Sequence, residues 1–246
     1  MGKGKLKKFA ENETFACLIQ PSTEELLGRD HPLKGNWKQT LFHNDRPIVL
    51  ELGCGKGEYT VALAERFPEK NYIGIDIKGA RLWKGAKYAT EHALGNVAFV
   101  RTRVELIESL FGPGEIDEIW LTFSDPQERK ARKRLTHPRF LESYRRMLPP
   151  GGIIHLKTDS RLLYHYTLEV ARCNGLPVVD CDEDIYTSGR ADSGLLSIQT
   201  FYEKNFRSQG IPITYLAFRL DGEGPLAEPE WDQTPYLQTY RTLTRS

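Results

Sequence analysis

The chain lacks several features that would assign it to a common class of proteins. No apolar stretch approaches the roughly 18 residues that a membrane-spanning helix needs, and the basic start leads into no apolar block like that of a secretory signal. Four cysteines in 246 residues, none in a Cys-x-x-Cys pair, do not form a disulfide scaffold or a zinc ribbon. We therefore expect no membrane partner, no metal site and a reducing, cytoplasmic setting.

Positive and negative charges are nearly equal in number but are unevenly distributed along the chain. The chain has 34 Lys and Arg against 33 Asp and Glu, a balance that does not by itself favour nucleic acid. Residues 127–146, however, contain eight Lys and Arg against two Glu, and residues 1–10 contain four more lysines. Such segregation produces a local positive field that suits an anionic partner, although a solvated helix face would give the same pattern.

Strands and helices alternate from Pro47 onward. Apolar runs predict seven strands, at residues 48–52, 72–76, 97–100, 116–123, 153–156, 177–179 and 213–218. Helical spacing predicts helices at 59–67, 80–93, 104–110, 139–148, 161–173 and 200–206. The alternation predicts an α/β fold with a doubly wound, mostly parallel, seven-stranded sheet. We expect an N-terminal arm with short elements at 1–46, the main domain at 47–220 and a C-terminal tail at 221–246.

A glycine-rich turn follows the first of these strands. Gly53, Gly55 and Gly57 allow the backbone to turn tightly and to approach a ligand closely. Their GxGxG spacing differs from the dinucleotide fingerprint GxGxxG, and Glu58 at the helix start would repel a pyrophosphate. A cationic sulfonium and ammonium suit Glu51 and Glu58 better, so the turn favours S-adenosylmethionine over a nicotinamide cofactor.

Three acidic residues follow later strands of the predicted sheet. Asp76 ends the second strand and could accept the hydroxyls of a ribose, while Asp125 follows the fourth strand and Asp159 the fifth. Ligands of open α/β sheets bind beyond the carboxyl ends of the strands, so these acids are expected to share one edge. Each also has a structural alternative: a helix cap for Asp76 and Asp159, and a turn for Asp125.

Six segments, taken in order, resemble the bacterial tRNA (guanine-N7)-methyltransferases, a family of class I, Rossmann-like methyltransferase fold. The segments are Glu51–Gly57, Gly74–Asp76, Phe123–Pro126, Lys133–Thr136, Leu156–Asp159 and Thr200–Glu203. The resemblance implies transfer of a methyl group from S-adenosyl-L-methionine to N7 of a guanosine in the variable loop of tRNA.

The resemblance also implies roles for individual residues. The cofactor would be held by Glu51, Asp76 and the three glycines Gly53, Gly55 and Gly57. Asp125 would be the active-site acid. Contacts with RNA are implied for Arg129 or Lys130, Asp159, Thr200, Phe201, Tyr202 and Glu203.

Two positions depart from the pattern of that family. Arg103 stands where the family often has an acid beside the adenine, so a backbone carbonyl or Glu105 must accept the adenine amino hydrogen. Gln127 replaces the Trp that usually follows Asp-Pro, and the basic loop is about two residues short. The choice between Arg129 and Lys130 as the RNA contact therefore stays open.

Other functions also stay open at this point. A methyltransferase acting on an exocyclic adenine amine would carry Asp/Asn-Pro-Pro-aromatic after the fourth strand, where this chain has Gln127 and Glu128. An NAD-dependent oxidoreductase would need the GxGxxG turn, and an inactive RNA-binding relative is a further alternative. Guanine N7 has a lone pair and no proton to lose, so a chain without an evident Cys or His nucleophile suits its methylation. The sequence does not decide between a monomer and a homodimer.

Overall fold

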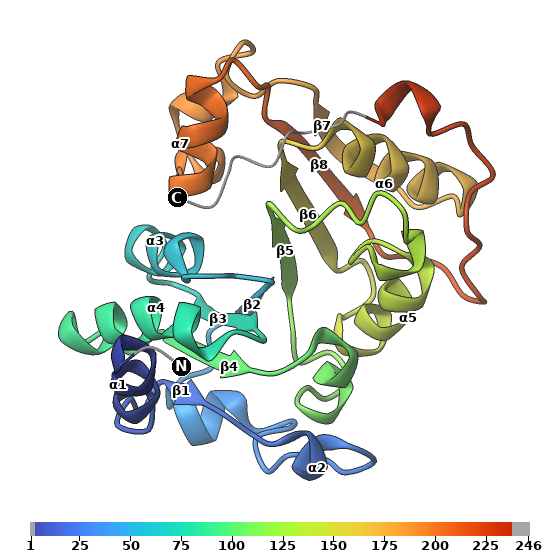
Figure 1. Ribbon diagram of the computed structural model, residues 1–246. Helices are drawn as coiled ribbons and strands as arrows, with labels where there is room; N and C mark the ends of the chain where they lie inside the picture. The colour runs from blue at the N-terminus through green and yellow to red at the C-terminus, as the bar shows by residue number, and fades with distance from the viewer. Residues whose placement is uncertain (1–2, 238–246) are drawn as a thin grey trace.

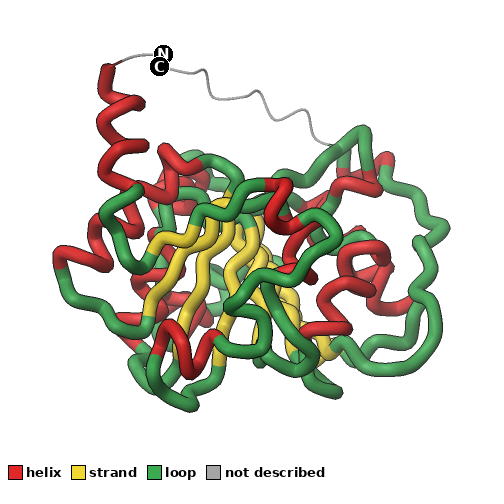
Figure 2. Tube along the Cα trace, turned by 90° about the horizontal axis from the view of Figure 1, so that it is seen from below, coloured by secondary structure: helices red, strands yellow, loops and turns green. Residues whose placement is uncertain are grey.

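The computed structural model describes residues 3–237, in which a central sheet is covered by helices on both faces (Figure 1). Eight strands run side by side, in the order β1-β4-β3-β2-β5-β6-β8-β7 (Figure 2). Their bounds are β1 Leu18–Ile19, β2 Ile48–Leu52, β3 Asn71–Asp76, β4 Val97–Arg101, β5 Glu118–Thr122, β6 Ile153–Thr158, β7 Val178–Asp182 and β8 Thr214–Arg219.

The helices form two layers. They are α1 Lys3–Asn12, α2 Thr23–Leu26, α3 Glu58–Arg66, α4 Gly79–Glu91, α5 Pro138–Met147, α6 Arg161–Cys173 and α7 Phe201–Ser208. Helices α1, α3 and α4 lie on one side of the sheet and α5 and α6 on the other (Figure 1). Helix α7 is separate from both layers, and α3 lies between α7 and α4 in the view of Figure 1. Short 3-10 helices include η2 Val104–Ser109 and η3 Ala131–Lys133.

The predicted α/β fold with a doubly wound, mostly parallel sheet is confirmed. Strands β1 to β6 pair in parallel, and β8 runs antiparallel to both β6 and β7. All seven predicted strands are present, but the predicted strand number is wrong because β1 adds an eighth at the edge, beside β4. This strand has two residues, too few for an apolar pattern to be recognised.

Strand β2 shows why the sheet forms a rigid platform. All five of its residues are buried, and their side chains alternate between the two faces, as a strand requires. Leu50 and Leu52 belong to one apolar cluster, and Val49 belongs to the other. A strand buried on both faces is typical of a parallel sheet covered by helices.

The carboxyl ends of β3, β2, β5 and β6 lie next to one another at a single edge of the sheet, because these strands are parallel and adjacent. This is the edge at which such sheets bind ligands.

The predicted division into arm, main domain and tail remains a prediction. Strand β1 of the arm joins the sheet, and α1 packs on α4. Residues 1–2 of the arm and 238–246 of the tail lie outside the described residues. Over 3–237, every helix is too short or too polar to cross a membrane.

Candidate active site

The turn after β2 carries three glycines in the left-handed conformation, with φ of 75° at Gly53, 59° at Gly55 and 71° at Gly57. A Cβ atom on Gly55 would meet nothing within 4 Å, whereas one on Gly57 would lie 2.5 Å from the ring of Phe99. Gly57 is therefore required for packing against the sheet. Gly55 instead leaves open space in front of the turn, where a ligand can approach the backbone, and a Cβ atom on Gly53 would meet only Leu135, at 3.9 Å.

Glu51, in β2, is a buried carboxylate that is 3% exposed. The hydroxyl of Thr60 donates to its Oε2 and that of Thr122 to its Oε1. Burial raises the pKa of Glu51 to about 7; the two threonine hydrogen bonds oppose the rise, and the charge of Asp76 adds to it. Within residues 3–237 the carboxylate forms no ion pair. A cationic ligand would supply the missing partner, so the residues present fit the positively charged end of S-adenosylmethionine.

Asp76, at the end of β3, is joined to the glycine turn. Its Oδ2 accepts a hydrogen bond of 3.1 Å from the backbone amide of Gly55, and its Oδ1 accepts one of 2.7 Å from that of Lys78. Each carboxylate oxygen has a second lone pair. The side chain is thus fixed by the backbone and can still accept two ribose hydroxyls.

Two cavities meet at Gly53. One is lined by polar side chains that include Glu51, Thr122, Thr200 and Tyr202. The other, of about 370 Å³, combines acidic and basic side chains with apolar walls, and its lining includes Asp76, Arg103, Glu105, Gln127, Leu135 and Phe140. A polar cavity beside a larger, partly apolar one matches the two halves of a nucleoside attached to an amino acid.

Arg103 lines the second cavity. Its Nε is 3.6 Å from Oε2 of Glu105, and its side chain is 58% exposed. Glu105 lines the same cavity as Arg103 and Asp76, so it lies where an acceptor for the adenine amino group is expected.

Asp125 is exposed on the loop that leaves β5. It lies between two residues other than glycine with left-handed backbones, Phe123 at φ 50° and Gln127 at φ 47°. Its Oδ1 accepts a 2.9 Å hydrogen bond from the amide of Gln127. Phe123 lines the first cavity and Gln127 the second. A bulky residue in this conformation is strained, and such strain is concentrated at functional sites.

The run of basic residues does not form one surface. Exposed side chains cluster in the loop after Asp125, at Arg129, Lys130, Arg132 and Lys133. Arg134, in contrast, is buried: it donates to the carbonyl of Pro126 and to Oε1 of Gln233, and lies 4.3 Å from the ring centroid of Tyr166. The arginines of α5 form ion pairs with neighbouring acids, in the pairs Arg139–Glu105, Arg145–Glu142 and Arg146–Glu108. The positive field expected for the whole run is therefore confined to the exposed loop.

The structure separates the four residues Thr200–Glu203. Thr200 and Tyr202 line the first cavity, and Tyr202 is 46% exposed. Phe201 is 53% exposed but lines a neighbouring groove instead. Glu203 is completely buried, so its carboxylate has no exposed surface with which to contact RNA, contrary to the prediction.

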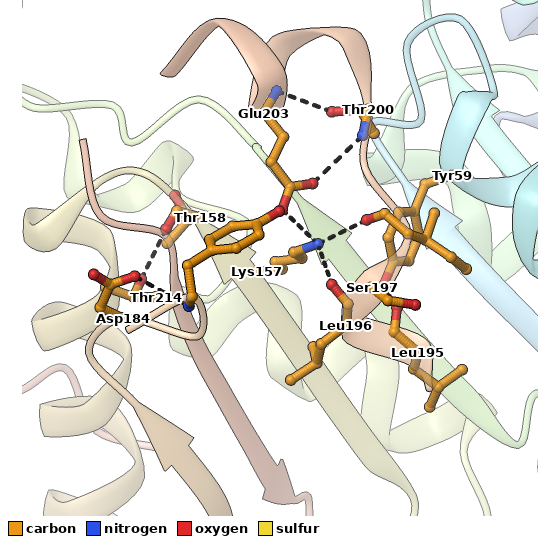
Figure 3. Close-up of polar contacts among 12 residues, drawn as sticks. Tyr59, Lys157, Thr158, Asp184, Leu195, Leu196, Ser197, Thr200, Glu203 and Thr214 are labelled. Atoms are coloured by element: carbon orange, nitrogen blue, oxygen red, sulfur yellow. Dashed lines mark hydrogen bonds and ion pairs between the residues drawn. The ribbon is translucent and has the colours of Figure 1, made fainter. Parts of the chain in front are cut away.

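Glu203 is held by a buried lysine that the sequence analysis did not single out (Figure 3). Nζ of Lys157, in β6, is 2.7 Å from Oε1 of Glu203 and donates to the carbonyls of Leu196 and Ile198. The carboxylate of Glu203 also accepts hydrogen bonds from the hydroxyl of Tyr186 and from the backbone amide of Thr200. In return, the backbone amide of Glu203 donates to the hydroxyl of Thr200. The sequence does contain a sign of this residue, because Lys157 is a charged residue within an otherwise largely apolar strand.

Asp159 directly follows β6, the strand adjacent to β5. It is partly buried, and burial raises its pKa to about 6. Asp125 and Asp159 thus leave neighbouring strands at the same edge of the sheet.

Comparisons with known proteins agree with this geometry. A family model described as a putative methyltransferase matches residues 45–216. A tRNA (guanine-N(7)-)-methyltransferase of Bacteroides thetaiotaomicron is 49% identical, covering 100% of this chain and 96% of that protein. One of Christiangramia forsetii is 51% identical, covering 89% and 98%.

A solved structure supports the fold alone. The 16S rRNA methyltransferase KamB matches with a TM-score of 0.58 at 15% identity, covering 75% of this chain and 92% of that chain. The family itself is shown by the match to the family model and by relatives that are about half identical over most of the chain. The chain belongs to the tRNA (guanine-N7)-methyltransferase family.

Proposed function

We propose that the protein transfers a methyl group from S-adenosyl-L-methionine to N7 of a guanosine in the variable loop of tRNA. The observation that carries the proposal is the crevice at the carboxyl edge of the sheet, which Glu51, Asp76 and the loop of Asp125 reach from three adjacent strands. Relatives that match nearly the whole chain are named for this reaction.

The residues around Gly53 provide the binding site for the cofactor, which supplies an electrophilic methyl group on a positively charged sulfur. Glu51 offers buried negative charge to the cationic end. Asp76 accepts the ribose hydroxyls, and the apolar wall of the second cavity covers the adenine. Glu105 accepts the adenine amino hydrogen, with Arg103 beside it at the rim.

The acceptor needs orientation rather than a strong base, because guanine N7 has no proton to lose. Holding N7 in line with the methyl carbon is a proximity effect worth several kcal/mol. Asp125 and Asp159 accept hydrogen bonds from N1–H and the exocyclic amine, and so offset the positive charge that develops on the purine. Asp159 performs this role when ionised, which its pKa of about 6 allows at neutral pH.

The exposed basic loop contacts the tRNA. Arg129 and Lys130, with Arg132 and Lys133, lie just beyond Asp125 and can bind phosphates. These contacts offset the few kcal/mol needed to expose a stacked guanosine. A tRNA substrate and four cysteines without disulfides support a cytoplasmic location.

The test is to map the methyl group on an unmodified tRNA transcript with a variable-loop guanosine. Borohydride and aniline should cleave the product at that position, because they act at N7-methylguanosine. A transcript with adenosine there serves as the control and should stay uncut. Asp125→Asn should lower kcat/KM by about a hundredfold while cofactor affinity changes little. Methyl incorporation without cleavage would contradict the proposal and favour an exocyclic amine.

A further inference from the structure

A groove of about 620 Å³ lies beside the first cavity of the crevice, between α3 and α4 on one side and α7 on the other. Figure 1 shows α7 facing α3 across this region. Lys56 and Glu58 line both the groove and the first cavity, so the two are neighbours. The resemblance implies an RNA contact for Phe201, but it leaves the other residues of the groove without an occupant.

The groove carries more positive than negative charge, with three lysines against two glutamates in its lining. Lys56, Lys84 and Lys204 line it, with Glu58 and Glu65 as the acids. Glu58 is already engaged: its Oε1 lies 2.8 Å from Nζ of Lys84, and its Oε2 accepts a 2.8 Å hydrogen bond from the amide of Phe201. Glu65 accepts a hydrogen bond from the hydroxyl of Tyr88. Over residues 3–237, Lys56 and Lys204 take part in no ion pair, so their charge faces the groove.

Phe201 presents a large apolar ring beside these lysines. The ring is 53% exposed, and Nζ of Lys56 lies 5.0 Å from its centroid. Its position is fixed, because Glu58 holds its amide and the capping box of Thr200 and Glu203 begins its helix. A rigid aromatic face beside lysines is the combination that binds single-stranded nucleic acid, with stacking for a base and charge for the phosphates.

We propose that this groove binds the nucleotides next to the target guanosine, with one base stacked on Phe201 and the phosphates on Lys56 and Lys204. The inference rests on the proposed function and extends it. The wall shared with the crevice and the complementary charge select this occupant. A guanosine turned into the crevice brings its neighbouring nucleotides to the adjoining groove. The aliphatic side chains of the lining, Val61 and Ala62, are small, which gives an apolar protein segment little to bury.

The test measures the dissociation constant of the full chain for unmodified tRNA transcript. Phe201→Ala and Phe201→Leu should weaken binding about tenfold, because both remove the flat ring, whereas Phe201→Trp should bind like wild type. Lys204→Ala should weaken binding several-fold and reduce the salt dependence, and Lys204→Arg should restore both. Lys87→Ala, on α4 but outside the groove lining, is the matched control and should change neither.

A second measurement identifies the stacked nucleotide. Transcripts with one abasic nucleotide on either side of the target guanosine are compared on wild type and Phe201→Ala. At one flanking position the loss of the base and the loss of the ring should not add, since each removes the same contact. Full additivity at every flanking position, or unchanged affinity in Phe201→Ala and Lys204→Ala, would overturn the inference.

The two claims fail differently. Wild type is first tested for N7 methylation of the same transcript. Absence of that product would refute the proposed function, whereas normal methylation with unaltered affinity in the groove variants would refute only the inference.

Discussion

At the residue scale, Glu51 is the side chain whose burial and charge most favour a cationic ligand. A buried carboxylate held by two threonine hydroxyls, with a pKa of about 7, is a costly feature for a core strand to keep. Thr60 and Thr122 orient the carboxylate without neutralising it. The arrangement is therefore suited to a ligand that brings positive charge.

Glu51→Gln should separate ligand binding from stability. Because the folded-state pKa lies above the ordinary value of 4.5, ionised Glu51 disfavours folding increasingly as pH rises from 4.5 to about 7. The neutral variant avoids that cost, so its free energy of unfolding at pH 8 should be equal to or higher than wild type, by up to about 3 kcal/mol. Its affinity for S-adenosylmethionine should fall at least about tenfold.

The pH dependence supplies the control for this variant. A cation favours the ionised carboxylate, so wild-type affinity for the cofactor should be highest above pH 7 and should decline as pH falls through it. In Glu51→Gln this decline should be absent. Denaturant unfolding and calorimetry measure the two quantities; a variant that binds the cofactor as wild type does would refute the role of Glu51.

At the scale of elements, the buried pair of Lys157 and Glu203 joins helix α7 to strand β6. Both side chains are fully buried, so removing one partner leaves an uncompensated charge in the core. The pair thereby holds Tyr202 at the crevice and Phe201 at the groove.

Lys157→Met should lower the free energy of unfolding by about 3–5 kcal/mol. The double variant Lys157→Met with Glu203→Met should recover most of that loss, since no charge is then buried, but it should still bind tRNA more weakly because α7 loses its capping box. Lys87→Met, at a partly exposed lysine of α4, is the control and should change stability by less than about 0.5 kcal/mol. Denaturant unfolding measures these changes. If Lys157→Met lowers the free energy of unfolding by less than about 1 kcal/mol, the pair does not anchor α7.

Elements were predictable from sequence to the extent that their signals are local. Apolar runs predicted β2 to β6 and β8, since each of these strands buries most of its side chains. Strand β7 was predicted from its apolar start although none of its five residues is buried. The two-residue β1 was missed. Arg134 and Glu203 could not be distinguished from their exposed neighbours, because their partners Gln233 and Lys157 are far away in the chain. Tertiary contacts, rather than local sequence, decide which charges of a run are buried.

At the scale of the whole molecule, the topology creates the site. Adjacent parallel strands bring acids that are far apart in sequence, Glu51, Asp76, Asp125 and Asp159, to one edge. That convergence was predictable because the strand–helix alternation dictates a parallel sheet. The split of the crevice into two cavities and an adjoining groove was not predictable, because it depends on where α7 and the loop of Asp125 fold back.

We propose that the turn leaving β2 binds a positively charged methyl donor. Calorimetric titration of the full chain with S-adenosylmethionine and, separately, with NAD tests this binding. We expect saturable 1:1 binding of S-adenosylmethionine, at least about a hundredfold tighter than any binding of NAD, a difference of about 2.7 kcal/mol. Equal affinities, or no binding of S-adenosylmethionine, would contradict it.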